Sequence, residues 1–209
     1  IDIVINELDA LAHIDLKTKE IKAIGRTLNI VRIGTSGSVQ ADIPVDSFVI
    51  SEKSIGCDGV LRFYANNESV CDHPFEEAFI RHCRWTPSAA RPYVVNADPG
   101  LVDRLYDEEH TIKGVTLTAV GFYGPQGRVL RLPLAMPGIN DRITAFRYEG
   151  YKVTNYEMES AAITGLCNLL GHRAATICLI IANRINGDAS ADYHSYMNKL
   201  IRYTLEKLS

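Results

Sequence analysis

The apolar positions along the 209-residue chain predict helices and strands in alternation. Near the start, apolar residues recur every three or four positions, the spacing of an amphipathic helix; they are Ile1, Val4, Ile5, Leu8 and Leu11. The polar stretch 15–26 then predicts an exposed connection. The β-prone run 28–33 ends at the Gly34-Thr35-Ser36-Gly37 segment, which predicts a short strand followed by a loop.

The same pattern continues to the C-terminus. Further strands are expected at 48–50, 115–120, 152–156 and 174–181. Helices are expected at 100–109, 157–170 and 197–208, and another starts at Asp72-His73-Pro74 with an apolar face that runs through His82. Asp72 is suited to cap the helix that starts there, and Gly171 is suited to end the helix at 157–170. The run 174–181 is apolar except for Thr176, as in a strand covered on both faces. Alternating strands and helices predict a three-layer α/β/α sandwich.

Composition excludes several classes of protein. The chain is 46% hydrophobic and 22% charged with a net charge of −3, values typical of a globular protein. Its longest apolar runs are far shorter than the roughly 20 residues of a spanning helix. The charge balance argues against nucleic-acid binding, which usually brings clustered Lys and Arg. At this length we expect one domain over residues 1–209.

Cysteine and histidine supply no metal-binding pattern. The five cysteines are irregularly spaced and form no CxxC pair, which leaves zinc and thioredoxin-type sites without support. We therefore expect no metal, and a reduced, cytoplasmic setting. Among the histidines, His13 and His172 are expected in solvated or capping positions.

Four polar segments follow predicted strands, where open α/β sheets bind ligands. In the first, Arg32–Gly37 (RIGTSG), glycine lets backbone N–H groups approach an anion. Thr35 adds a hydroxyl, and Arg32 adds a planar guanidinium fork. The alternative is a tight glycine turn with Arg32 paired to a surface carboxylate. The segment is neither a Walker loop nor a GxGxxG fingerprint, which argues against nucleoside triphosphates and dinucleotides.

The second segment is Gly121–Arg128 (GFYGPQGR), which combines aromatic rings with an amide and a guanidinium. A planar heterocycle requires such a set: a stacking face, a donor–acceptor pair and a charged donor. The alternative is a Gly/Pro turn with solvated polar side chains.

The third segment, Asn155–Ser160 (NYEMES), places Glu157 and Glu159 at a helix start. Acidic residues are favoured there by the helix dipole, which is the simpler explanation. However, Glu159 precedes an apolar helix, and a carboxylate entering a protein interior needs partners, which sugar hydroxyls would provide.

The fourth segment, Ile180–Arg184 (IIANR), ends a core strand in an amide and a guanidinium. A surface ion pair of Arg184 is the alternative explanation here.

In this order and spacing, RIGTSG, FYGPQGR, NYEMES and IIANR resemble the nucleoside phosphorylases, and within them the uridine phosphorylases. The resemblance covers the whole chain. It implies a sandwich fold around a mixed, twisted central sheet. The implied activity is reversible phosphorolysis of uridine to uracil and ribose 1-phosphate, with inorganic phosphate as co-substrate and no cofactor. It also implies a homo-oligomer, a dimer or hexamer, whose subunits share active sites.

The resemblance assigns roles to single residues. Arg32 and Thr35 match phosphate-binding residues, with Thr35 also near the ribose. Ser36 and Gly37 match the stretch alongside the base, and Phe122 matches the aromatic ring that stacks on uracil.

Further matches concern the base and the ribose. Gln126 and Arg128 match the pair that binds the uracil carbonyls and N3–H, and Arg184 matches an arginine that supports this pair. Met158 and Glu159 match ribose contacts, and Glu157 matches a neighbouring position in that pocket. The residues then expected to carry catalysis are Arg32, Gln126, Arg128 and Glu159.

The end of the last core strand bears on the choice of base. Similar purine enzymes have an aspartate there to protonate or hydrogen-bond the purine N7, whereas this chain has Asn183 and Arg184. Uridine is therefore preferred. A phosphorylase for deoxyuridine, thymidine or a purine nucleoside, and a non-catalytic nucleoside-binding protein, remain alternatives.

One part of the family pattern has no counterpart here. Family members carry a phosphate-binding glycine and arginine before any position equivalent to Ile1, and borrow a histidine and an arginine from a neighbouring subunit. The resemblance therefore implies that the N-terminal part of the family fold is missing from this sequence.

Overall fold

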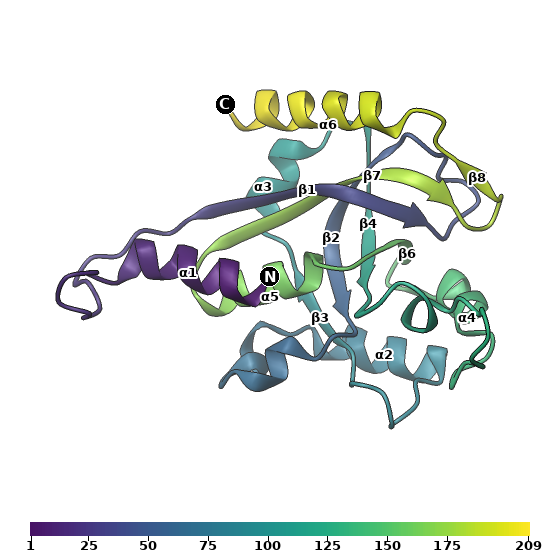
Figure 1. The fold of residues 1–209 in the computed structure, drawn as a ribbon, viewed down its shortest axis with the longest axis horizontal. Helices are drawn as coiled ribbons and strands as arrows, with labels where there is room; N and C mark the ends of the chain where they lie inside the picture. The colour runs from purple at the N-terminus through teal and green to yellow at the C-terminus, as the bar shows by residue number, and fades with distance from the viewer.

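The computed structural model describes all 209 residues. They form one mixed sheet with helices on both sides (Figure 1). The longer strands are β1 (Asn29–Ser38), β2 (Phe48–Gly56), β3 (Tyr93–Asn96), β4 (Thr111–Thr118), β6 (Tyr151–Glu157) and β7 (Arg173–Asn183). Two short strands, β5 (Arg147–Tyr148) and β8 (Asp188–Ala189), pair antiparallel with β6 and β7, respectively.

The strand order is β3-β2-β4-β6-β1-β7-β8, and β2 also pairs with β7. This extra pairing closes β2, β4, β6, β1 and β7 into a ring. The β1–β7, β2–β4 and β4–β6 pairs are parallel, whereas β1–β6, β2–β3 and β2–β7 are antiparallel. The predicted mixed sheet is therefore confirmed, and its closure is an addition to the prediction.

Helices cover both faces because side chains alternate along each strand. In β7, Ala174 packs in the core beneath α1 (Asp2–His13) and α5 (Ser160–Leu169). Ala175 and Ile177 pack on the other face, beneath α3 (Pro99–Leu105) and α6 (Tyr193–Leu208). Figure 1 shows α6 on the side opposite α1 and α5. A third core lies beneath α2 (His73–Cys83) and α4 (Ile139–Ala145).

Short 3-10 helices and capped ends complete the architecture. The 3-10 turns are η1 (Val60–Phe63), η2 (Asn67–Val70) and η3 (Gly124–Gln126). As predicted, Asp72 caps α2 by accepting a hydrogen bond from the Phe75 N–H at 3.2 Å. Gly171 follows α5 with a φ of +75°, a conformation that favours glycine. None of the helices combines the length and apolar character needed to cross a bilayer.

Several predicted boundaries are wrong. The loop expected at 34–37 is part of β1, because β7 pairs with this strand as far as Ser38; a register shift falls between Ser36 and Gly37. The helix expected from Glu157 begins at Ser160, since Glu157 is the last residue of β6. The helix expected to reach residue 109 ends at Leu105.

The apolar stripe of α1 is the other difference. The helix is present, yet only Ile5 and Ala12 are buried in it. Val4 is 55% exposed and Leu11 is 62% exposed, so most of the predicted stripe faces away from the packed core.

Candidate active site

A cavity of about 350 Å³ lies at the last residues of β1, β6 and β7. All eleven residues singled out from the sequence line it: Arg32, Thr35, Ser36, Gly37, Phe122, Gln126, Arg128, Glu157, Met158, Glu159 and Arg184. Three lining residues were missed, namely Tyr156, Ile181 and Ala182. Each of them lies within a motif already recognised, one to three positions from a chosen residue, so position in the motif was the available signal.

Arg32 lies between two carboxylates. Its Nη1 is 3.3 Å from Glu157 Oε2, and its Nη2 donates a hydrogen bond to Glu159 Oε2. Nη1 also contacts the sulfur of Cys178 on β7 at 3.1 Å. Burial opposes the charge on Arg32, but the thiol and the carboxylates outweigh it and raise the pKa of the guanidinium. Arg32 is therefore a fixed cation facing the cavity.

The two carboxylates differ in exposure and in how far the protein itself occupies their oxygens. Both oxygens of Glu157 are bound within the protein: Oε2 accepts from the N–H groups of Glu159 and Ser160 at 2.8 Å, and Oε1 accepts from the hydroxyls of Thr118 and Ser160 at 2.6 and 2.8 Å. The Glu157 side chain is 1% exposed, whereas that of Glu159 is 35% exposed. Glu157 thus anchors Arg32, and Glu159 is accessible to a ligand.

Gln126 is buried beneath two guanidinium groups. Its Oε1 accepts hydrogen bonds from Arg128 Nη1 at 2.6 Å and from Arg184 Nη2. Because guanidinium groups only donate, this fixes the amide orientation and leaves Nε2 as the donor available to a ligand. The pKa of Arg184 is lowered to about 10, by burial and by the charge of Arg128.

The aromatic ring expected to stack on a base has a protein partner. Phe122 is 54% exposed, and the guanidinium of Arg128 lies 3.9 Å from its ring centroid. Arg128 also donates to the Phe122 carbonyl at 2.7 Å. One face of the ring is therefore covered by a cation, and a ligand has to use the other face or displace it.

The remaining lining residues come from the end of β1 and from the short connection between β6 and α5. Ser36 is buried, and its Oγ has no hydrogen-bond partner within the protein. A Cβ at Gly37 would lie 3.3 Å from Arg184 Nε, so this glycine lets the arginine pack against the strand. Thr35 is half-buried and Met158 is 40% exposed.

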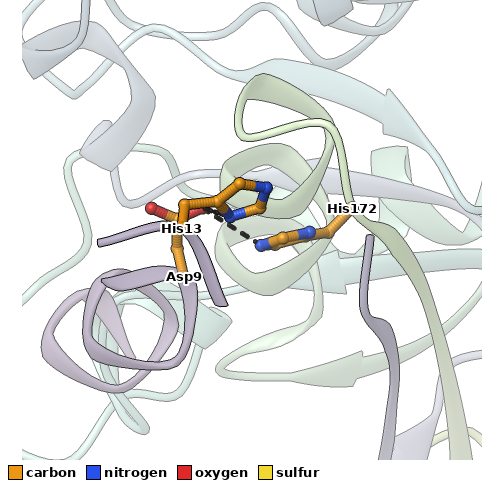
Figure 2. Close-up of side chains that lie close together, drawn as sticks. All are labelled: Asp9, His13 and His172. Carbon is orange, nitrogen blue, oxygen red and sulfur yellow. Dashed lines mark ion pairs between the residues drawn. The ribbon is translucent and has the colours of Figure 1, made fainter. Parts of the chain in front are cut away.

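A second cluster joins α1 to the turn before β7. Asp9 Oδ1 lies 2.9 Å from His13 Nδ1 and 3.2 Å from His172 Nε2 (Figure 2). The prediction of a solvated or capping His172 is wrong, because its side chain is fully buried. These residue types are able to bind metal ions. However, the Leu28 N–H donates to His172 Nδ1 at 3.2 Å, so Nδ1 is an acceptor and the ring proton is on Nε2, the atom a metal would need.

Comparison with known proteins identifies the family. The sequence pattern of the phosphorylase superfamily matches residues 15–204. The chain belongs to the phosphorylase superfamily. This agrees with the resemblance carried by the four motifs.

Relatives within the superfamily include two from Schistosoma mansoni. Uridine phosphorylase A is 36% identical over 160 residues, covering 76% of this chain and 49% of the relative. Inactive uridine phosphorylase B is 36% identical over 87 residues, covering 37% of this chain and 26% of the relative. This chain spans about half the length of the curated relatives that it matches most extensively.

A solved structure supports the fold. The chain is similar to a Trypanosoma brucei nucleoside phosphorylase described as showing uridine phosphorylase activity, with a TM-score of 0.79 and 22% identity. The match covers 99% of this chain and 75% of the other. At this identity, the likeness establishes the shared architecture of the two chains.

Proposed function

We propose that the protein catalyses the reversible phosphorolysis of uridine to uracil and ribose 1-phosphate, as a pentosyltransferase. One observation carries the proposal: a single cavity combines a guanidinium held by two carboxylates with an amide held by two guanidinium groups. The first group suits phosphate and ribose hydroxyls, and the second suits a base with carbonyl groups. Inorganic phosphate is the co-substrate, and we propose no cofactor.

The proposed chemistry explains why donors gather around the base. The glycosidic C–N bond breaks as a phosphate oxygen bonds to the anomeric carbon, and the electron pair leaves with uracil. Negative charge therefore grows on the uracil carbonyls. Donors such as Gln126 Nε2 and Arg128 bind this departing anion more tightly than the neutral base, which lowers the barrier.

The same donors favour uracil over a purine. Gln126 Oε1 is already bound by Arg128 and Arg184. Gln126, Arg128 and Arg184 therefore offer a base hydrogen-bond donors, and none of the three is an acid that would protonate a purine N7. Asn183, at the end of β7, is fully engaged elsewhere. Its Nδ2 donates to the carbonyls of Gln40 and Ile43 at 2.9 and 2.8 Å. Asn183 is therefore unsuited to act on the base.

The two members of the Arg32–Glu159 ion pair bind different ligands, phosphate at Arg32 and ribose at Glu159. In the proposal, phosphate competes with Glu159 for the Arg32 guanidinium, and Thr35 adds a hydroxyl contact. The released Glu159 then accepts hydrogen bonds from the 2′- and 3′-hydroxyls of the ribose, beside Met158. Glu157 keeps Arg32 in place throughout, since its other contacts lie within the protein.

The test is phosphate-dependent release of uracil from uridine, compared with deoxyuridine, thymidine and inosine. Replacing Gln126 or Arg128 by Ala removes a donor aimed at the departing base. We expect kcat/KM for uridine to fall about a hundredfold or more. Arg131→Ala is the matched control, because this neighbouring arginine is exposed and does not line the cavity. Equal kcat/KM in all three variants and the wild type would remove the pair from the mechanism.

A second candidate is nucleoside binding without turnover. The relative named inactive uridine phosphorylase B supports it, since a similar sequence carries that description. Calorimetry with uridine in the presence of phosphate separates the two candidates. Heat of binding with no uracil formed favours the non-catalytic protein, and uracil formed in proportion to phosphate consumed favours the enzyme.

We further propose a homo-oligomer with shared active sites, a dimer or a hexamer, in a cytoplasmic setting. Three apolar residues close to Arg128 support the association: Val129, Leu130 and Leu132 are 58%, 77% and 78% exposed. All five cysteines are free thiols, which fits a reducing compartment. Sedimentation velocity tests the assembly: Leu130→Asp should shift the protein towards monomer, and a wild-type monomer would contradict the proposal.

A further inference from the structure

The turn that carries Gln126 and Arg128 is tied to the fold by few backbone contacts. Its own hydrogen bonds are local: the N–H groups of Gln126 and Arg128 donate to the Tyr123 carbonyl at 3.0 and 2.9 Å. The carbonyls of Gln126 and Gly127 take part in no backbone pair. Their partners decide where the turn lies.

Asn140, the second residue of α4, supplies a partner to both carbonyls. Its Nδ2 donates to Gln126 O at 3.2 Å and to Gly127 O at 3.3 Å. Its Oδ1 accepts from the Tyr156 hydroxyl at 3.1 Å. Because a carbonyl only accepts, this is the amide orientation that satisfies all three contacts. Asn140 therefore links β6, through Tyr156, to the turn.

The packing between Asn140 and the turn is close. A Cβ at Gly127 would lie 2.4–2.6 Å from the side-chain amide of Asn140, and Gly127 has a φ of +68°. Glycine is thus required at 127 both by conformation and by the approach of Asn140. The turn rests directly on this amide.

A second support reaches the same carbonyl from Arg184, the residue that follows β7. Arg184 Nη1 donates to Gln126 O at 3.2 Å, and its guanidinium lies 4.4 Å from the Tyr156 ring centroid. Tyr156 therefore contacts both supports, Asn140 through its hydroxyl and Arg184 through its ring. Asn140 itself does not line the cavity, so any effect on a ligand passes through the turn.

We infer that Asn140 is a positioning residue for uracil recognition: from α4 it fixes the turn at 126–127, so that Gln126 Nε2 and the Arg128 guanidinium face the base together. The inference rests on the proposed function, because it assigns the pair to the base. Phosphate binding depends on Arg32, which Asn140 does not contact. Loss of Asn140 should therefore act on the base alone.

The experiment measures uracil and inorganic phosphate binding by calorimetry in Asn140→Ala and Asn140→Asp. We expect the Kd for uracil to rise about tenfold in both, while the Kd for phosphate stays unchanged. The Asp variant keeps the shape but places carboxylate oxygens against two carbonyls, so it should not rescue binding. Asp141→Ala, at the next and exposed position of α4, is the matched control.

Hydrogen exchange at the amides of 126–128 gives a readout that needs no ligand. Both Asn140 variants should speed exchange there relative to Asp141→Ala. Wild-type exchange in the turn, a Kd for uracil within twofold of wild type, or equal losses for uracil and phosphate would each overturn the inference. If the wild type binds uracil but does not release it from uridine, the proposed catalytic activity is wrong. The positioning role of Asn140 is then still decided by the uracil Kd and by hydrogen exchange in the turn. If it binds no uracil, the assignment to the base falls with the proposed function.

Discussion

Arg32 depends on the absence of a side chain at Gly34. A Cβ at this position would lie 2.6 Å from Arg32 Cζ and Nη1, so the guanidinium folds back directly over the glycine. From there it reaches Glu157 and the sulfur of Cys178. In β1, glycine thus provides space for the cation of the site, whereas the sequence suggested that it admits an anion to backbone N–H groups or forms a tight turn.

Gly34→Ala should therefore weaken phosphate binding. The chain is expected to fold, because the added methyl group meets the movable end of a side chain, but the guanidinium has to leave its place beside Glu157. We expect the Kd for inorganic phosphate, measured by calorimetry, to rise about tenfold or more. Gly100→Ala, at the exposed start of α3, is the control. Unchanged phosphate affinity in Gly34→Ala would show that Arg32 does not bind the anion from this position.

The cysteines form a second group whose chemistry is set by burial. Burial raises the pKa of the Cys83, Cys167 and Cys178 thiols to about 12, and that of half-buried Cys71 to about 12 with help from Glu76. An ordinary thiol has a pKa of about 8.5. Since the unfolded chain loses these protons first, the free energy of unfolding should fall as pH rises above about 8.5.

Thiol labelling checks these pKa shifts. The native protein should react slowly with a disulfide reagent at pH 8, because the thiolate fraction is small, and the rate should climb about tenfold per pH unit up to pH 9. Cys71 should react first, as the partly exposed thiol. Protein unfolded in urea serves as the control, in which all five thiols react at once. A native rate that levels off near pH 8.5 would contradict the raised pKa values.

Among the elements, α1 is held to the rest by few buried residues and by Asp9. This carboxylate lies 3.2 Å from Nε2 of fully buried His172 (Figure 2). Asp9→Ala removes the carboxylate that lies beside this nitrogen and beside His13 Nδ1, so we expect a loss of about 1 kcal/mol in the free energy of unfolding, measured in urea. Glu7→Ala, exposed on the same helix, is the control. Equal stability of the two variants would mean that the pair contributes nothing to the docking of α1.

The elements with strong local signals were predicted from the sequence. The Asp72 cap and the continuous apolar run of β7 are examples, since each depends on neighbouring residues in the chain. The four residues of β3 and the seven of α4 are too short to establish a period. The extension of β1 to Ser38 depends on pairing with β7, more than 100 positions away. Local patterns do not contain such information.

The candidate site divides in the same way. Its residue types and motifs could be read from the sequence, and the fold brings them into one cavity. Their division of labour could not: both oxygens of Glu157 are bound within the protein, and Gln126 Oε1 is bound by two arginines. The contacts of Asn140 with the turn join residues 14 and 13 positions apart and belong to no motif.

For the whole molecule, the pairing of β2 with β7 joins the cores on both faces of the sheet. Ile50 pairs with Ile177 at this closure, and both belong to the core beneath α3 and α6. Ile55, further along β2, belongs instead to the core beneath α2 and α4. Because β2 contributes to both cores, a substitution that destabilises one core should also lower the stability of the other.

Leu200→Ala tests this coupling and the prediction of one domain over 1–209. Leu200 is fully buried in the core beneath α6, so its truncation should cost about 2–5 kcal/mol. The single tryptophan, Trp85, packs against the other core, with its ring 5.9 Å from Phe79. If the cores unfold together, the urea midpoint should fall equally by Trp85 fluorescence and by far-ultraviolet circular dichroism. Leu205→Ala, 60% exposed on the same helix, should leave both midpoints near wild type. A fluorescence midpoint that stays in place while the dichroism midpoint falls would show two independently unfolding parts.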